Sequence, residues 1–134
     1  LQNLQSISKL ETMEVDLVIE AIIEDVAVKR NLFATLEDVL PEDAIISSNT
    51  SSLPITQLAT QLKRASRFAG LHFFNPATVM KLVEVIEGAA TDKKIVEQLI
   101  AFTLTLNKVP VVAKDSPGFI VNRVARHFYV EALK

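Results

Sequence analysis

Apolar runs and amphipathic stretches alternate along the chain. Residues 16–21 read D-L-V-I-E-A, a short run with β-branched side chains, which predicts a strand buried on both faces of a sheet. Between residues 24 and 40, Val28, Leu32 and Leu36 recur at four-residue spacing, which predicts an amphipathic helix. Pro41 ends that helix because proline disrupts helical hydrogen bonding. The pattern therefore begins with a strand followed by a helix.

The same alternation continues through the remaining residues. Thr91 is the expected N-cap of a later helix, and Ser116 with Pro117 suit the N-cap and first position of the last helix. Pro110 cannot donate to a ladder, so the strand around it is expected at a sheet edge. Strand and helix in alternation predict an α/β fold with a partly parallel sheet, and ligands beyond the carboxyl ends of its strands. Further strands are predicted over 44–48, 68–74, 81–86 and 109–113, and further helices over 54–62, 91–106 and 118–134.

Composition and charge narrow the classes of function. The 134 residues are 49% hydrophobic and 22% charged, which is typical of a globular chain with a buried core. A net charge of −2 provides no broad positive field, so we expect no nucleic-acid partner and no membrane partner. The chain has no cysteine and two histidines, so we expect no metal site. No run of about 18 apolar residues is present, and we expect a soluble protein.

His72 and Glu84 could form a pair with chemical use. His72 lies near the end of a predicted strand, where α/β proteins place ligands, and Glu84 interrupts an apolar run. A buried Glu84 would need a cation or donor, and His72 is the nearby titratable candidate in the sequence. Such a pair makes a general base, because the carboxylate fixes the tautomer of the imidazole. Spacing alone leaves open a surface histidine and an ordinary strand glutamate.

Other polar residues have ordinary explanations when they are taken by themselves. The cluster N-T-S-S at 49–52 could be a turn with an N-cap or a ligand contact. Glu20, Glu24 and Lys29 would be solvated charges at a helix start, and Asn122 would lie on the surface of a first helical turn. The chain contains no G-x-G-x-x-G and no P-loop. The residues alone therefore indicate an α/β domain with a candidate His-Glu pair.

Five segments, taken together, make the chain resemble a known family. In order and spacing they are similar to the L-3-hydroxyacyl-CoA dehydrogenase family, over residues 14 to 134. The segments are D-L-V-I-E-A at 16–21, S-N-T-S-S-L at 48–53, G-L-H-F-F-N-P at 70–76, M-K-L-V-E-V at 80–85 and D-S-P-G-F-I-V-N-R at 115–123.

The resemblance implies a reaction and the residues that perform it. His72 would be the catalytic base and Glu84 its orienting partner, while Asn122 would hold the acyl-CoA carbonyl. Ser51 would contact both substrate and the nicotinamide end of NAD. The base would remove the proton of the 3-hydroxyl group as hydride passes to NAD, giving a 3-ketoacyl-CoA. A histidine suits this step because both of its protonation states are accessible near neutral pH.

The resemblance also implies a cofactor and a domain organisation. Ala21, Glu24, Lys29, Ser51 and Asn75 match NAD contacts of the family. We therefore expect residues 1–115 to be part of a Rossmann-like NAD-binding domain that lacks its first βαβ unit. Residues 116–134 would be the junction and the first helix of a helical C-terminal domain.

The expected setting is acyl-CoA oxidation. The parent enzyme would be a homodimer or part of a multifunctional β-oxidation protein, in a bacterial cytoplasm or a mitochondrial matrix. The end of the chain is similar to the branch that acts on 3-hydroxyadipyl-CoA, although that branch tends to have proline where His127 stands. The alternative is a non-catalytic binding or assembly module that keeps the fold without turnover, and the absence of a glycine-rich loop within the chain motivates it.

Overall fold

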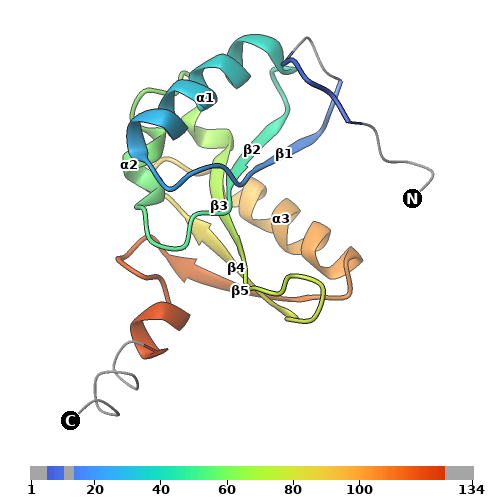
Figure 1. The fold of residues 1–134 in the computed structure, drawn as a ribbon, viewed down its shortest axis with the longest axis vertical. Helices are drawn as coiled ribbons and strands as arrows, with labels where there is room; N and C mark the ends of the chain where they lie inside the picture. Colours follow the sequence, from blue (N-terminus) through green and yellow to red (C-terminus); the bar gives the residue numbers. More distant parts are fainter. Residues whose placement is uncertain (1–5, 11–13, 126–134) are drawn as a thin grey trace.

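A mixed β-sheet forms the centre of the computed structural model, which describes residues 6–10 and 14–125 (Figure 1). The first three strands are parallel, β4 runs antiparallel to β3, and β5 runs parallel to β4. This mixed sheet confirms the predicted α/β fold, and β5 lies at an edge as expected from Pro110. In spatial order the strands are β1 (Leu17–Glu20), β2 (Ile45–Ser48), β3 (Phe68–Phe73), β4 (Leu82–Glu87) and β5 (Val109–Lys114).

Helices cover both faces of the sheet, because neighbouring strand residues point to opposite sides. On β2, Ile46 joins the apolar cluster that contains Phe33 of α1, whereas Ile45 joins the cluster that contains Leu99 of α3. No helix within the described part of the chain is long and apolar enough to cross a membrane. The helices are α1 (Val26–Val39), α2 (Ile55–Ala59) and α3 (Lys93–Thr105), with a 3₁₀ turn at Ala65–Arg67.

The predicted N-cap at Thr91 is wrong. The Thr91 hydroxyl is buried, donates to Phe68 O at 2.6 Å and accepts from Gly88 N, so it serves the sheet. The carboxylate of Asp92 accepts from Lys94 N at 3.0 Å and caps α3. The buried carbonyl group of Phe68 needs a donor, and Thr91 provides it. The N-cap of α3 is therefore Asp92, one residue later than predicted.

The start of the last predicted helix also differs from the expectation. Residues 121–125 are helical, and the three residues before them are not in a helix. Gly118 has φ +74° and Phe119 has φ +49°, values that no right-handed helix contains. Ser116 and Pro117 therefore precede a left-handed turn and do not begin a helix. The rest of that prediction, including His127, lies outside the described residues.

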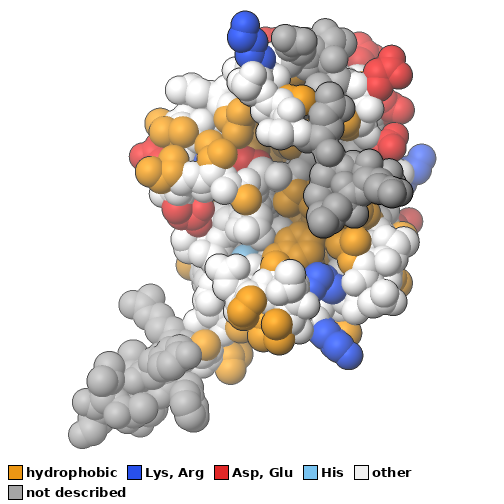
Figure 2. All heavy atoms as spheres, turned by 45° about the vertical axis from the view of Figure 1, so that its right-hand side comes forward, with side chains coloured by type: hydrophobic (Ala, Val, Ile, Leu, Met, Phe, Trp, Pro, Cys, Tyr) orange, Lys and Arg blue, Asp and Glu red, His pale blue; other side chains and the backbone are white. Residues whose placement is uncertain are grey.

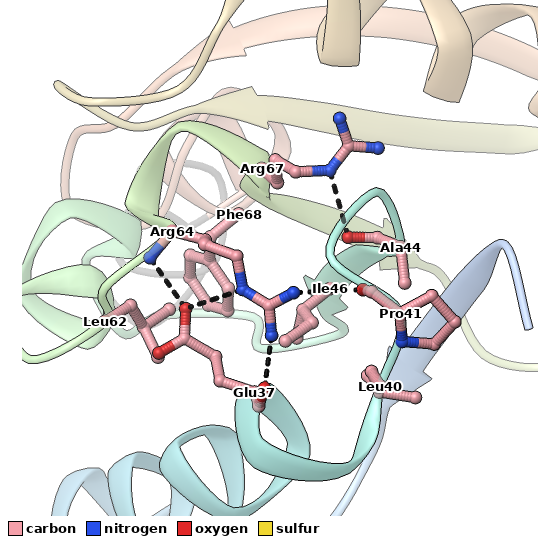
Figure 3. A pocket seen from close by; sticks show the side chains of 9 residues that line it. All are labelled: Glu37, Leu40, Pro41, Ala44, Ile46, Leu62, Arg64, Arg67 and Phe68. Carbon is pink, nitrogen blue, oxygen red and sulfur yellow. Dashed lines mark hydrogen bonds and ion pairs between the residues drawn. The ribbon is translucent and has the colours of Figure 1, made fainter. Parts of the chain in front are cut away.

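A cluster of polar residues lies at the end of the sheet where the parallel strands begin, opposite to their carboxyl ends (Figure 3). The buried Glu37 carboxylate accepts from the backbone N–H of Lys63 and Arg64, at 2.9 and 2.7 Å. The Arg64 guanidinium donates to the carbonyl oxygens of Glu37 and Pro41. These bonds satisfy carbonyl groups where α1 ends. The cavity beside them measures about 10 Å³, which is room for one water molecule.

Gly70 on β3 sits where two elements approach closely. A Cβ atom at this position would lie 2.8 Å from Ile86 Cβ and 2.9 Å from Ile55 Cδ1, and both isoleucines are fully buried. We expect Gly70→Ala to lower the free energy of unfolding by about 1–3 kcal/mol, because the core must shift to admit a methyl group. Urea unfolding measures this change. A loss below about 0.5 kcal/mol would contradict the tight packing of β3 against α2.

Candidate active site

The carboxyl ends of the parallel strands bring the candidate residues to one edge of the sheet. The strand registers pair Glu20 with Ser48 and Ser48 with Gly70, so β1 and β2 end side by side, while β3 continues to Phe73. The segments that leave them carry Ala21, the 49–52 cluster and Asn75. Asn49 Oδ1 accepts from Phe73 N at 2.8 Å and ties the end of β2 to the end of β3. Polar groups far apart in the sequence thus line a common edge.

His72 and Glu84 form a buried hydrogen-bonded pair. They are direct cross-strand partners in the antiparallel β3–β4 ladder, so their side chains lie on the same face. His72 Nδ1 lies 2.9 Å from Glu84 Oε2, and the two residues are 6% and 0% exposed. The structure therefore contains the His72–Glu84 pair for which the sequence made these residues candidates.

The pairing determines which histidine nitrogen can accept a proton. A carboxylate only accepts hydrogen bonds, so Nδ1 carries the hydrogen and the lone pair is on Nε2. Within the described residues, no group bonds to Nε2. The ring lies against Phe74, with centroids 4.4 Å apart, and Phe119 lies 6.1 Å away. The arrangement can perform general base catalysis at Nε2.

The other oxygen of Glu84 contacts a different part of the chain. Its Oε1 accepts from the backbone N–H of Ile120 and of Val121, each at 2.9 Å. Asn122, the next residue, donates from Nδ2 to Ser51 O at 2.9 Å. Asn122 and Ser51 are 71 residues apart in the sequence, and the structure brings both close to the dyad.

A buried ion pair stands behind this edge. Lys29 Nζ lies 2.7 Å from Glu20 Oε1, and both side chains are at most 1% exposed. Glu20 Oε2 also accepts from Ser48 Oγ at 2.6 Å. The interpretation of Glu20 and Lys29 as solvated helix-start charges is wrong, because the strand ends and α1 enclose them. The sequence did carry a signal for Glu20, which is a single charge within an apolar run.

Glu24 organises the loop after β2. Its carboxylate accepts from Thr50 Oγ1, and from the backbone N–H of Ser51 and the hydroxyl of Ser52 at 3.3 and 3.2 Å. Burial acts to raise the pKa of the Glu24 carboxyl, but the hydrogen bonds from Thr50, Lys29 and Ser52 and the charge of Lys29 lower this pKa below its ordinary value of 4.5. Thr50 belongs to the 49–52 cluster, for which the sequence left open a turn or a ligand contact, and its buried side chain bonds to Glu24.

The surface at this edge exposes both polar and apolar side chains. Ala21, Ser51 and Asn75 are exposed, and the Glu24 side chain is 38% exposed. Beside them Ile22 and Ile23 are 41% and 69% exposed, and Figure 2 shows that apolar side chains form several exposed groups on one face of the molecule. These residues are therefore open to solvent at the carboxyl edge of the sheet.

Lys29 has a different place from the one that direct contact with a cofactor requires. It is 1% exposed, and its ammonium group lies within 3.3 Å of acceptors on Glu20, Ile22 and Glu24. It supports Glu24 from behind, so the structure gives it a positioning part.

Removal of the Lys29 charge should destabilise the fold. We expect Lys29→Met to lower the free energy of unfolding by about 3–5 kcal/mol, because Glu20 is left as an uncompensated buried charge. The double variant Glu20→Gln with Lys29→Met should recover part of this loss. Denaturant unfolding measures both, with exposed Lys94→Met as the control that changes stability by less than about 0.5 kcal/mol. A single variant as stable as the control would contradict the buried pair.

The lowered pKa of Glu24 predicts a dependence of stability on pH. A carboxyl whose pKa is lower in the folded state stabilises the fold above its unfolded pKa, about 4.5, and this contribution is lost as pH falls through the folded pKa. The stability difference between the wild type and Glu24→Gln should therefore be constant near neutral pH and shrink below about pH 4.5. Urea unfolding between pH 7 and pH 3 measures it, and a difference that does not change over this range would refute the prediction.

Comparisons with known proteins identify the family of the chain. A family model described as 3-hydroxyacyl-CoA dehydrogenase, NAD binding domain, matches residues 1–116. The chain is 56% identical over 117 residues to 3-hydroxyadipyl-CoA dehydrogenase of Escherichia coli (strain K12), covering 87% of this chain and 25% of that protein. It is 52% identical over 119 residues to the mitochondrial hydroxyacyl-coenzyme A dehydrogenase of Sus scrofa, covering 89% of this chain and 38% of the relative. Another relative is the fatty acid oxidation complex subunit alpha of Idiomarina loihiensis.

A solved structure supports the same assignment. The crystal structure of a 3-hydroxybutyryl-CoA dehydrogenase from Escherichia coli K12 has a TM-score of 0.86 and 56% identity, covering 87% of this chain and 25% of that one. The chain thus spans between a quarter and two fifths of the length of the two dehydrogenases from Escherichia coli and Sus scrofa. Family model, relatives and fold agree, and the chain belongs to the 3-hydroxyacyl-CoA dehydrogenase family, whose NAD-binding domain it matches over residues 1–116.

Proposed function

We propose that the chain is part of an NAD-dependent dehydrogenase that oxidises an L-3-hydroxyacyl-CoA to a 3-ketoacyl-CoA. The observation that carries the proposal is the buried His72–Glu84 pair, whose Nε2 is left without a bond from the described residues. The edge of the sheet on which the pair lies also carries the exposed residues that suit a dinucleotide. Membership of the family supports the same reaction.

In the proposed reaction His72 moves one proton. Nε2 accepts the proton of the 3-hydroxyl group, while Nδ1–H stays bonded to Glu84 Oε2. The Glu84 carboxylate offsets the positive charge of the resulting imidazolium. NAD, when bound, accepts the hydride from C3 of the substrate. In the reverse direction the imidazolium returns the proton to the ketone oxygen.

Binding is divided between two groups of residues in this proposal. Ala21, Glu24, Ser51 and Asn75 would hold NAD, with Lys29 acting through Glu24. Ser51 would also contact the substrate, and Asn122 would orient the acyl carbonyl. The hydrogen bond between Asn122 Nδ2 and Ser51 O supports a common site for both substrates.

The relatives support a proposed setting for the enzyme. We place the boundary of the nucleotide-binding part at residue 115, with residues 116–134 leading into a helical domain; the family match to residue 116 supports this boundary. The parent protein would be a homodimer or part of a multifunctional β-oxidation protein, as the named fatty acid oxidation complex subunit suggests. Its location would be a bacterial cytoplasm, with a mitochondrial matrix as the alternative that the relative from Sus scrofa represents.

The decisive experiment replaces the proposed base in the full-length dehydrogenase. We expect His72→Gln to lower kcat by about 10²–10⁴-fold and to leave NAD affinity nearly unchanged, because the variant removes proton transfer and few cofactor contacts. Glu84→Gln should cause a smaller loss, since glutamine accepts a hydrogen bond but carries no charge. Steady-state oxidation of a 3-hydroxyacyl-CoA and calorimetric titration of NAD measure the two effects.

The chain offers a matched control in its second histidine. The proposal assigns His127 no role, so we expect His127→Gln to keep kcat near that of the wild type. If His72→Gln also keeps it, another residue is the base and the assignment fails. If the wild type oxidises no 3-hydroxyacyl-CoA, the non-catalytic module is the better description.

A further inference from the structure

We infer that the turn and helix start at residues 118–121 are a positioning device for the dyad. Two backbone N–H groups, those of Ile120 and Val121, hold one oxygen of the Glu84 carboxylate so that the other oxygen faces His72. The inference rests on the proposed function and extends it to a segment beyond the sheet.

The contacts of Glu84 divide between its two oxygens. Oε2 lies 2.9 Å from His72 Nδ1, and Oε1 accepts from both backbone N–H groups at 2.9 Å. Glu84 is 0% exposed, so protein groups replace water around the carboxylate. Without these two N–H groups, Oε1 of Glu84 would lose both donors, and the side chain could rotate to reach other hydrogen-bond donors. The amides therefore select the rotamer that orients His72.

The backbone before these amides has the conformation that aims them. Gly118 and Phe119 are consecutive left-handed residues, with φ +74° and +49°. Positive φ is unfavourable for a bulky residue such as phenylalanine, and such conformations persist where surrounding contacts enforce them. Phe119 is 2% exposed, its N–H donates to Ser116 O, and its ring lies 6.1 Å from the His72 ring. The hydrogen bond to Ser116 and the buried Phe119 ring thus hold the turn in place next to His72.

The segment is also anchored on either side of the turn. Asp115 accepts from the N–H of Ile55 and of Thr56, at 2.8 and 2.7 Å, and so fixes the chain where β5 ends. Beyond the turn, Asn122 Nδ2 donates to Ser51 O. The position of the helix start is therefore set by α2 and by the loop after β2, and it transmits that position to Glu84.

An alternative explanation is that Glu84 holds the helix start, and that the helix start does not position Glu84. In that case Glu84 would only cap the helix, and loss of one N–H would leave His72 unaffected. The two explanations differ in what happens to the histidine tautomer and to kcat. Substitutions that change one backbone N–H or the turn conformation can separate them.

The first experiment compares Val121→Pro with Val121→Ala in the full-length dehydrogenase. Both variants shorten or alter the side chain, but only proline removes the N–H, and position 121 is the first helical residue, where proline is tolerated. We expect Val121→Pro to lower kcat about 10- to 100-fold relative to Val121→Ala, with NAD affinity unchanged. NMR of the imidazole nitrogens of His72 should show loss of the single Nδ1–H tautomer in the proline variant alone.

A second pair of variants tests the turn and leaves the sequence of the helix unchanged. Gly118→Ala places an unfavourable residue at φ +74°, whereas Gly118→Asn places a larger one that tolerates this conformation. A Cβ atom there would have ordinary contacts, the nearest at 3.4 Å from Asn122 Cβ, so the cost of Gly118→Ala comes from the backbone conformation. Gly118→Ala should lower kcat and mix the tautomers, and Gly118→Asn should restore both toward the wild type.

The outcomes separate this inference from the proposed function. If Val121→Pro and Gly118→Ala keep both the kcat and the His72 tautomer of their partner variants, the positioning device does not exist. The dehydrogenase assignment would then still stand, provided that His72→Gln is inactive. If Val121→Pro fails to fold, the Gly118 pair decides the question by the same two measurements.

Discussion

The buried carboxylate of Glu84 is the constraint on which the arrangement of the site depends. An ionised carboxylate enclosed in a sheet must be surrounded by donors, because burial without them is costly. Glu84 obtains three, from His72 Nδ1 and from the backbone N–H groups of Ile120 and Val121. These donors come from β3 and from the start of the last helix. One charged side chain on β4 therefore fixes both the proposed base and the segment that carries Asn122.

A second buried charge, on Glu20, plays the same part at the ends of β1 and β2. Glu20 at the end of β1 accepts from Lys29 of α1 and from Ser48 of β2. Lys29 in turn lies 3.3 Å from Glu24, whose carboxylate holds the loop after β2. Breaking a buried pair is far more costly than making one is favourable, so such pairs fix geometry more than they add stability. The exposed residues at this edge are thus held in place by buried charged groups beneath them.

Corrections to the sequence-based prediction concern competition for hydrogen bonds. Thr91 has the residue type of an N-cap, yet its hydroxyl is needed by the buried carbonyl of Phe68, and Asp92 caps α3 instead. Ser116 and Pro117 suit a helix start, yet the chain makes a left-handed turn first, and Glu84 accepts from the N–H groups of Ile120, just before the helix, and Val121, its first residue. Local sequence offered an adequate partner in both cases, and a partner far along the chain prevailed.

The sequence by itself determined the order of strands and helices and the partly parallel sheet, because hydrophobic periodicity is a local property of the chain. It also determined the edge position of β5, through Pro110, and the family, through the order and spacing of its motifs. It also identified His72 and Glu84 as a candidate pair. Only the tertiary structure decided that Glu20 and Lys29 are buried, that Lys29 supports Glu24 from behind, and that Glu84 bonds to the last helix. Burial and long-range donors depend on which surfaces meet when the chain packs, and no short window of sequence contains that information.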